Sequence, residues 1–248
     1  SMHGSAGRLG GLAYLSVDAV IVLGNITAVD AGIETPMHGG AIYSEVSGSV
    51  NITSSTFDGF KSTGRGGFLF VDEQCLIAFT DVSINGAEAE YGAALYISER
   101  GSVLLDSVRI SSCVAQRAAG GIYFDGTLRE SKFHELHISN CMATGTGALA
   151  GAIFIDDSAS IDLSGGVTLS DNTAPTASAI YVDQQGELMG CQGCVLRNNY
   201  AARRGTVFVD QKALLNISDV SFENNIALAS GGAIHSVREI GRASCRER

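Results

Sequence analysis

Apolar and polar residues alternate along this chain in short runs, and the same arrangement of runs returns about every 27 residues. The most regular run is a pair of small residues followed by aliphatic, aromatic and aliphatic positions and, in most copies, an acidic residue. Its aromatic position recurs at intervals of 26 to 31 residues. The copies lie at residues 11–14, 40–43, 67–70, 93–96, 120–123, 151–154, 178–181 and 205–208, and a ninth begins at 232. Self-similarity at this period predicts a solenoid.

The repeated runs predict strands rather than helices. They are short, rich in Val, Ile, Thr, Phe and Tyr, and separated by Gly, Ser, Asn and Asp. No segment has apolar residues at the spacing of a helical face. The 31 glycines and only 2 prolines suit tight turns and strands that are paired on both edges. We therefore expect an all-β fold, a right-handed parallel β-helix (β-solenoid) of about eight coils with about 27 residues in each.

A second apolar column supports this fold, because one large apolar residue recurs once per coil outside the repeated phrase. The column consists of Phe57, Ile84, Ile110, Ile138, Leu169, Leu196 and Phe222. Polar pairs that precede it, such as residues 80–81 and 218–219, predict a corner between two strands. Three positions after the column, Asn172, Asn199 and Asn225 fall in successive coils. We expect these amides to stack and to hydrogen-bond along the axis.

The phrase and the column together resemble a known repeat. Gly-Gly-Ala-Ile occurs at 39–42 and 231–234, and Phe222 with Asn225 forms a Phe-x-x-Asn pair. This combination resembles the polymorphic outer-membrane protein repeat, within the pectin-lyase-like β-helix superfamily. The resemblance covers about residues 10–238 and implies the surface-exposed passenger of a secreted adhesin, extracellular or on the cell surface, at the outer membrane if bacterial. The superfamily also contains polysaccharide lyases and glycoside hydrolases, so the fold alone does not choose between them.

Charge and chain organisation narrow the class of partner. The net charge of −10 argues against nucleic acid and anionic membranes, and no apolar stretch is long enough for a membrane span. Residues 1–238 are expected to form a single β-helix domain that is truncated at both ends, since the pattern starts and stops inside a coil. Residues 239–248 resemble a translated sequencing adapter and are excluded from the expected fold.

The aromatic column is the first candidate site. Period-two alternation places the aromatic rings on one strand face and the flanking aliphatic residues on the other. Since branched aliphatic residues suit the interior, we expect the rings to form an outward-facing strip that binds a glycan, a surface protein or the remainder of the parent chain. The alternative is a stack that stabilises the sheet and is partly covered by loops. The predicted ligand-binding residues are Tyr43, Phe70, Tyr96, Tyr123, Phe154, Tyr181 and Phe208.

An acidic column follows the aromatic one at the end of each strand. It consists of Glu45, Asp72, Asp125, Asp156, Asp183 and Asp210. The first interpretation is that these carboxylates cap the turns through local backbone hydrogen bonds. The second is a calcium site in which Asp156, Asp183 and Asp210 bridge adjacent coils, the only cofactor the sequence suggests. The third is acid–base catalysis. Its candidates are Asp125, Asp156, Asp157 and Asp183.

The cysteines give a weaker signal. Cys191 and Cys194 form a Cys-x-x-Cys motif, but both fall in columns that other coils fill with apolar residues. We therefore expect small core residues rather than a metal or redox site. Cys113 and Cys141 share a column in adjacent coils, where either a disulfide or a pair of buried thiols is possible.

Three sequons are further candidates for modification. Asn25, Asn51 and Asn216 each begin an Asn-Ile-Thr or Asn-Ile-Ser triplet, the acceptor pattern for N-glycosylation. Asn51 and Asn216 are expected in the same outward column. Modification at these positions requires a eukaryotic, secreted source.

Irregularity is where a unique site is expected in a repeat. The longest interval, 31 residues from Tyr123 to Phe154, contains His134 and His137. His134 is expected at the corner and His137 facing outward, where it could join Arg129 and Glu130 in a polar patch. Four arginines precede the repeated phrase, where solvated turn charges are expected. They are Arg65, Arg117, Arg203 and Arg204.

These patterns favour a non-enzymatic surface segment that serves adhesion or recognition through an outward aromatic–acidic face. Uniform repetition supports it, because a catalytic site should break the repeat at one place. The alternative is a polysaccharide lyase or glycoside hydrolase that uses the acidic column.

Overall fold

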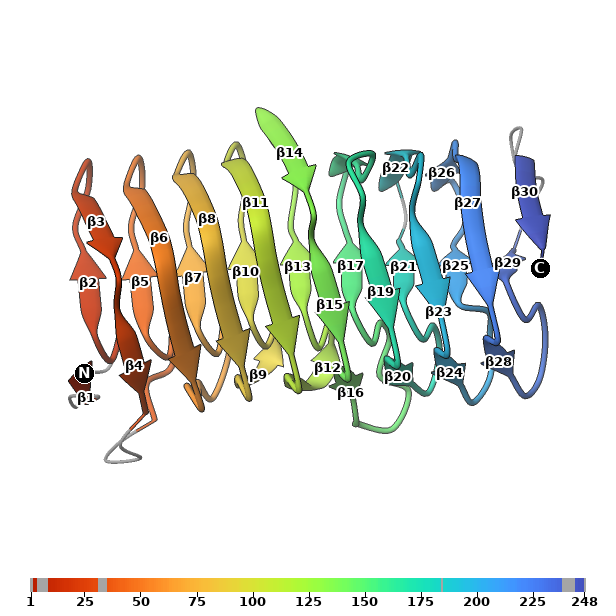
Figure 1. Cartoon of the computed structure of the whole chain (residues 1–248), viewed down its shortest axis with the longest axis horizontal. Coiled ribbons are helices and arrows are strands. Elements are labelled where there is room, and N and C mark those ends of the chain that lie inside the picture. The colour runs from red at the N-terminus through yellow and green to blue at the C-terminus, as the bar shows by residue number, and fades with distance from the viewer. Residues whose placement is uncertain (1, 4–8, 31–34, 184, 238–243, 248) are drawn as a thin grey trace.

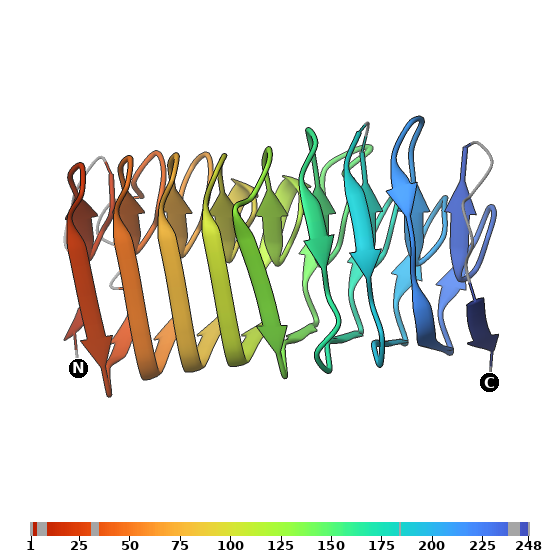
Figure 2. The ribbon, with the colours of Figure 1, turned by 90° about the horizontal axis from the view of Figure 1, so that it is seen from above.

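The computed structural model describes residues 2–3, 9–30, 35–183, 185–237 and 244–247. Every regular element among them is a strand, and strands of successive coils pair in parallel along one axis (Figures 1 and 2). The result is a β-solenoid of about 8 turns with about 27 residues between equivalent positions. The predicted all-β, parallel β-helix architecture is therefore confirmed.

The repeated phrase forms one sheet of nine strands, called here the ladder sheet. Tyr14 pairs with Tyr43, and Tyr43 with Phe70, so the phrase stays in register from coil to coil. The ladder sheet consists of β2 (Ala13–Leu15), β5 (Ile42–Ser44), β7 (Leu69–Val71), β10 (Leu95–Ile97), β13 (Ile122–Phe124), β17 (Ile153–Ile155), β21 (Ile180–Val182), β25 (Val207–Val209) and β29 (Ile234–Ser236).

Steric crowding explains why small residues open the repeated phrase. Gly66 has a φ of +64°, and a Cβ there would lie 2.2 Å from the carbonyl oxygen of Leu69. Gly67 faces the next coil, where a Cβ would lie 2.4 Å from the carbonyl oxygen of Ala93. A residue with no side chain is therefore required for the turn to close against its neighbour.

A second sheet of twelve strands forms the opposite wall. Its longest strands bend in the middle at residues with positive φ, for example Asp81 (54°) and Ser107 (55°), which are the polar positions predicted as a corner. The sheet consists of β1 (Met2–His3), β3 (Val20–Gly24), β4 (Thr27–Val29), β6 (Ser49–Asp58), β8 (Leu76–Asn85), β11 (Ser102–Ser111), β14 (Glu130–His134), β15 (His137–Ser139), β19 (Thr168–Ser170), β23 (Val195–Arg197), β27 (Ser218–Glu223) and β30 (Ser244–Glu247). Strand β30 pairs with β27, beyond the predicted limit of the β-helix at residue 238.

Two smaller sheets complete each coil. The six-stranded sheet consists of β9 (Glu88–Tyr91), β12 (Val114–Ala118), β16 (Met142–Ala143), β20 (Thr173–Ala174), β24 (Tyr200–Ala201) and β28 (Ile226–Ala227). The three-stranded sheet consists of β18 (Ser160–Asp162), β22 (Glu187–Gly190) and β26 (Leu214–Leu215). No helix among the described residues is long and apolar enough to cross a membrane.

The interior is filled by the two predicted apolar columns. Burial of one such side chain contributes about 1.5–3 kcal/mol, so the stacked columns are a main source of stability. The second column is buried along its full length, from Phe57 to Phe222. The apolar residues on either side of the ladder aromatics, all aliphatic except Phe124, are also buried. They are Ile42, Leu69, Leu95, Ile122, Ile153, Ile180 and Val207, with Val71, Ile97, Phe124, Ile155, Val182 and Val209.

The predicted asparagine stack is present in the last coils. The Asn172 side chain donates from Nδ2 to Oδ1 of Asn199 at 3.1 Å, and Asn199 donates in the same way to Asn225 at 3.0 Å. The same oxygens accept backbone N–H groups, because Asn172 N lies 3.0 Å from Asn199 Oδ1. Each amide also donates to a carbonyl of the preceding coil, such as that of Leu169 at 3.0 Å. The stack thus satisfies buried polar groups at a turn inside the rod.

Two of the cysteines are joined by a disulfide, and the structure also shows which cysteines are free. Cys191 and Cys194 are buried in the core columns as expected, but they form a disulfide with each other. The turn between them brings the Cα atoms to 5.3 Å, helped by Gly193 at a φ of +76°. The sequence left open whether these cysteines are free or paired, and the structure shows them paired. Cys113 and Cys141 are buried free thiols.

Candidate functional site

The aromatic rings of the ladder sheet stack face to face along the rod. Ring centroids of neighbours lie 4.7 Å apart for Tyr96 and Tyr123, and 5.5 Å apart for Tyr14 and Tyr43. These rings form a hydrophobic cluster separate from the main core, on the other face of the ladder sheet. Their placement opposite the aliphatic columns agrees with the alternation in the sequence.

The expected exposure of this strip is wrong. Only Tyr14, at 48% exposure, is open to solvent, and Tyr43 is half-buried. The other rings are 0–7% exposed, namely Phe70, Tyr96, Tyr123, Phe154, Tyr181 and Phe208. Each ring covers the face of the next, and alanines from the preceding turns, such as Ala118 and Ala150, pack against the stack. The stack therefore stabilises the sheet under a cover of turns, and its rings cannot offer their faces to a ligand.

Arg65, Arg117 and Arg203 are exposed, as predicted for solvated turn charges, but Arg65 and the partly buried Arg204 also contribute to the cover. The Arg65 guanidinium lies 4.8 Å from the Tyr96 ring centroid, and that of Arg204 lies 4.2 Å from Phe208. Sequence spacing could not reveal these contacts, because they depend on how each turn folds back over the sheet. Such cation–π contacts are worth about 0.5–2 kcal/mol each.

The acidic column accepts the tyrosine hydroxyls of the preceding coil. Tyr96 donates to Asp125 at 2.5 Å, and Tyr123 donates to Asp156. Tyr181 and Tyr14 have the equivalent bonds, to Asp210 and Glu45. The sequence spacing indicated the aromatic column and the acidic column separately. It did not indicate that a tyrosine of one coil bonds to the carboxylate of the next coil, 29 residues away in the case of Tyr96 and Asp125.

Burial and these carboxylates keep the tyrosines protonated. Burial, followed by the hydrogen bond to Asp125, raises the pKa of Tyr96 well above its usual range. The pKa of Tyr123 is raised by burial and by Asp156. At the exposed end, the hydrogen bond to Glu45 raises the pKa of Tyr14 to about 12. The tyrosine–carboxylate pairs are therefore structural links between coils.

The turn-capping interpretation of the acids is confirmed at three positions. The Oδ1 atoms of Asp72, Asp156 and Asp210 accept the backbone N–H of the following residue at 3.0, 3.0 and 2.6 Å. Within the part of the chain that the structure describes, no group of three acidic, histidine or cysteine side chains is close enough to hold a metal ion. The calcium set of Asp156, Asp183 and Asp210 is thus not assembled. Of the catalytic candidates, Asp125 and Asp156 are engaged by tyrosines, and Asp157 is exposed on a turn.

One coil interrupts the ladder face, as the 31-residue interval between Tyr123 and Phe154 suggested. Nine residues separate β16 from β17, against five between β20 and β21. The extra residues lie in 144–149, called here the insertion loop. Tyr123 still pairs with Phe154, so the insertion leaves the register intact.

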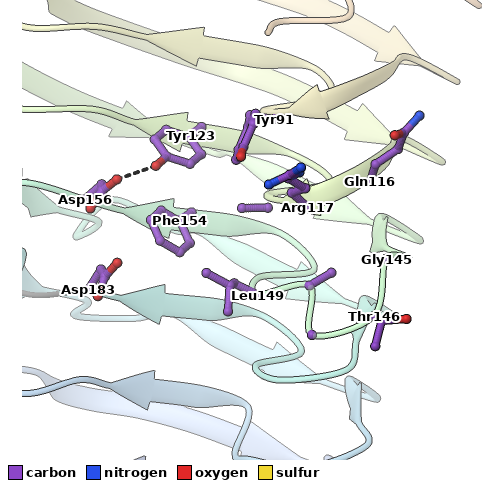
Figure 3. A pocket seen from close by; sticks show the side chains of 13 residues that line it. Tyr91, Gln116, Arg117, Tyr123, Gly145, Thr146, Leu149, Phe154, Asp156 and Asp183 are labelled. Atoms are coloured by element: carbon purple, nitrogen blue, oxygen red, sulfur yellow. Dashed lines mark hydrogen bonds between the residues drawn. The ribbon is translucent and has the colours of Figure 1, made fainter. Parts of the chain in front are cut away.

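The insertion loop is the shared wall of two hollows on the ladder face. The first groove, of about 570 Å³, is lined by Tyr91, Gln116, Arg117, Asp156 and Asp183 (Figure 3). The second groove, of about 370 Å³, is lined by Thr176, Tyr181, Arg203, Arg204, Asp210 and Gln211. Gly147 and Leu149 of the insertion loop line both. Both grooves thus border the otherwise covered stack.

The first groove has opposite chemistry on its two sides. Figure 3 shows Gln116 and Arg117 on the side of the insertion loop, and Asp156 and Asp183 across the ladder sheet. Arg117 Nε lies 2.5 Å from the Glu90 carboxylate, which holds the guanidinium at the rim. Hydrogen-bond donors therefore face acceptors across an apolar floor that includes Leu149.

The histidines of this coil lie on another wall. His134 pairs with Asp106 in the strand register, and its Nδ1 lies 2.9 Å from the Asp106 carboxylate, which raises the pKa of His134. This confirms its place at the corner. The predicted patch of Arg129, Glu130 and His137 is not formed: Arg129 donates to Gln74 and Glu130 pairs with Lys132.

The three sequons remain predictions. Asn25 and Asn216 are exposed, whereas Asn51 is half-buried within β6. All three sites are thus reachable at least in part from solvent.

Comparison with known proteins gives one match. Residues 219–237 match the Chlamydia polymorphic membrane protein (Chlamydia_PMP) repeat. The matched segment contains Phe222, Asn225 and the Gly-Gly-Ala-Ile phrase at 231–234, which carried the resemblance in the sequence. The chain thus contains this repeat within a parallel β-solenoid, which points to a surface-associated bacterial protein. Searches of curated proteins and of solved structures find no match to the chain.

Proposed function

We propose that this chain is a non-enzymatic recognition segment of a surface protein, and that it binds its ligand at the grooves beside the insertion loop. The observation that carries the proposal is the insertion itself, which breaks the uniform ladder face at one coil and lines both hollows. The polymorphic membrane protein repeat at 219–237 supports the surface location.

The chemistry of the ladder face favours binding over catalysis. A general acid or base needs a carboxyl group that can exchange protons with a substrate. Asp125, Asp156 and Asp210 instead accept a tyrosine hydroxyl from the neighbouring coil, which fixes their role as acceptors. A rigid wall with fixed donors and acceptors loses little entropy on binding, which suits adhesion.

The test is to delete the insertion. Removal of residues 145–148 shortens the interval between Tyr123 and Phe154 from 31 to 27 residues and restores the regular period. We expect this variant to fold and to lose binding to the cells or surfaces that the unaltered chain binds, measured with the purified chain on whole cells by flow cytometry. The control is Arg100→Ala, an exposed arginine outside both grooves.

Equal binding by the deletion variant and the unaltered chain would refute the proposed site. Absence of binding to any cell type or surface would refute recognition as the function. Release of sugar from a polysaccharide panel, lost in Asp156→Asn, would establish the enzymatic alternative instead.

A further inference from the structure

We infer that the two grooves are subsites for one neutral, linear glycan that lies along the rod axis and crosses the insertion loop at Gly147. This inference rests on the proposed function and names the ligand class. Three features of the molecule support it. The grooves run along the axis, donors face acceptors across them, and no described ladder strand that borders them has a free edge.

The groove residues follow the axis, one coil after another. Leu149 N donates to the Arg117 carbonyl at 2.9 Å, Ala177 N to that of Leu149 at 2.9 Å, and Arg204 N to that of Thr176 at 3.1 Å. With Tyr91 one coil before Arg117, the turn side of the two grooves spans four coil-to-coil steps. At about 4.8 Å per step this is roughly 19 Å, so the ligand is elongated.

The opposite side repeats at the same spacing. Asp183 N donates to the Ile155 carbonyl and Asp210 N to the Val182 carbonyl, both at 2.9 Å, so Asp156, Asp183 and Asp210 lie in successive coils. A ligand along the axis thus meets three carboxylates in three successive coils on one side. On the other side it meets Arg117 in the first groove and Arg203 in the second.

A glycan matches this arrangement. Each sugar carries hydroxyl groups that both donate and accept, so one unit can donate to a carboxylate on one side and accept from a guanidinium or from Gln116 on the other. The floor contributes apolar surface from Leu149 and from Tyr91, which suits the C–H faces of a sugar ring. At the crest between the subsites, a Cβ on Gly147 would meet no atom within 4 Å, so the chain of sugars has room to cross.

Other ligand classes fit less well. A peptide that adds as a strand needs an unpaired sheet edge, but β13, β17, β21 and β25 are each paired on both sides. A polyanionic chain would approach three carboxylates in a protein of net charge −10, which disfavours uronate and sulfated polymers and nucleic acid. A neutral polymer of hydroxyl-rich units avoids both penalties.

The experiment measures binding of neutral linear oligosaccharides of two to eight units, with polyuronate and sulfated counterparts of the same lengths. The probes are oligosaccharide series of glucose, xylose, mannose and N-acetylglucosamine. Their affinity for the whole chain is measured by titration calorimetry. We expect at least one neutral series to bind saturably, with affinity that rises with length until the grooves are filled. Gln116→Ala should weaken binding up to about tenfold, as expected for one lost neutral hydrogen bond, and Arg117→Ala about tenfold or more, because the lost bond comes from a charged group.

The controls separate this inference from the proposed function. Arg100→Ala should leave affinity unchanged, and circular dichroism should show that each variant keeps its strand content. The glycan inference is overturned if no neutral series binds or if a polyanionic series binds as tightly as the neutral one. It is also overturned if neither groove substitution changes the affinity. Whole-cell binding that survives periodate oxidation of surface glycans but not protease treatment would overturn it too, while leaving recognition intact.

Discussion

Replacement of Asn199 by alanine removes the middle member of the asparagine stack. The Asn199 side chain is fully buried and takes part in four hydrogen bonds. Its oxygen accepts both the backbone N–H and the side chain of Asn172, and its nitrogen donates to the Leu169 carbonyl and to Asn225. Every one of these partners belongs to another coil, so one truncation breaks contacts on both sides.

The magnitude follows from the groups left unpaired. The side-chain nitrogen of Asn172 still donates to the Ile138 carbonyl. The backbone N–H of Asn172 loses its acceptor, the Asn199 side-chain oxygen. The Asn225 oxygen loses one donor, the Asn199 side-chain nitrogen, and keeps the backbone N–H of residue 199, near the surface where water can replace the lost bond. A buried group without a partner costs about 1–3 kcal/mol, so we expect a loss of about 2–5 kcal/mol in the free energy of unfolding.

Urea denaturation followed by circular dichroism measures this loss, and native-state hydrogen exchange shows where it acts. Exchange should accelerate first at the amides of Asn172 and Tyr200, whose coils the stack joins. The matched control is Asn216→Ala, an exposed asparagine. A loss for Asn199→Ala no larger than that of the control would show that the stack does not stabilise the rod.

Three further predictions test other parts of the structure. Tyr123→Phe should lower the free energy of unfolding in urea by about 1–2 kcal/mol, because Asp156 loses the tyrosine hydroxyl as a donor; an unchanged free energy of unfolding would show that the tyrosine–carboxylate bond does not stabilise the fold. In the folded state the pKa values of Tyr96, Tyr123 and Tyr181 are raised above 10.0, so their contribution to stability is complete below pH 10 and falls as pH rises above it; constant stability from pH 9 to 11.5 would contradict this. Dithiothreitol should reduce the Cys191–Cys194 disulfide and lower stability by about 1–2 kcal/mol, with no effect on a variant in which both are serine; an equal effect on that variant would exclude the disulfide as the cause.

The architecture could be predicted from sequence because every coil repeats the same constraint. Branched residues facing inward recur along the ladder sheet, a glycine or alanine recurs at the tight approach in most coils, and an amide recurs at the buried turn of the last three coils, all at one period. Gly66, Ile42 and Asn199 could therefore be assigned from spacing alone. The polar corner at Asp81 followed from the same period.

The surface could not be predicted in the same way. Alternation correctly placed the aromatic rings away from the core, but it carries no information on what the turns do above them. Ala118, Ala150 and the Arg204 guanidinium cover the rings through turn conformations that no periodic signal encodes. The disulfide between Cys191 and Cys194 likewise depends on the turn at Gly193. The two grooves that the insertion loop lines were indicated only by the irregular interval.

The undisturbed register around the insertion loop has a consequence for how such a protein can change over time. Tyr123 and Phe154 pair in the same register as the other ladder residues. A change in the length of this turn therefore leaves the strand pairing on either side intact. Mutation and selection can then act on the exposed turns of each coil almost independently of the scaffold. Related chains could thus differ in their turns while they retain a single folding pattern.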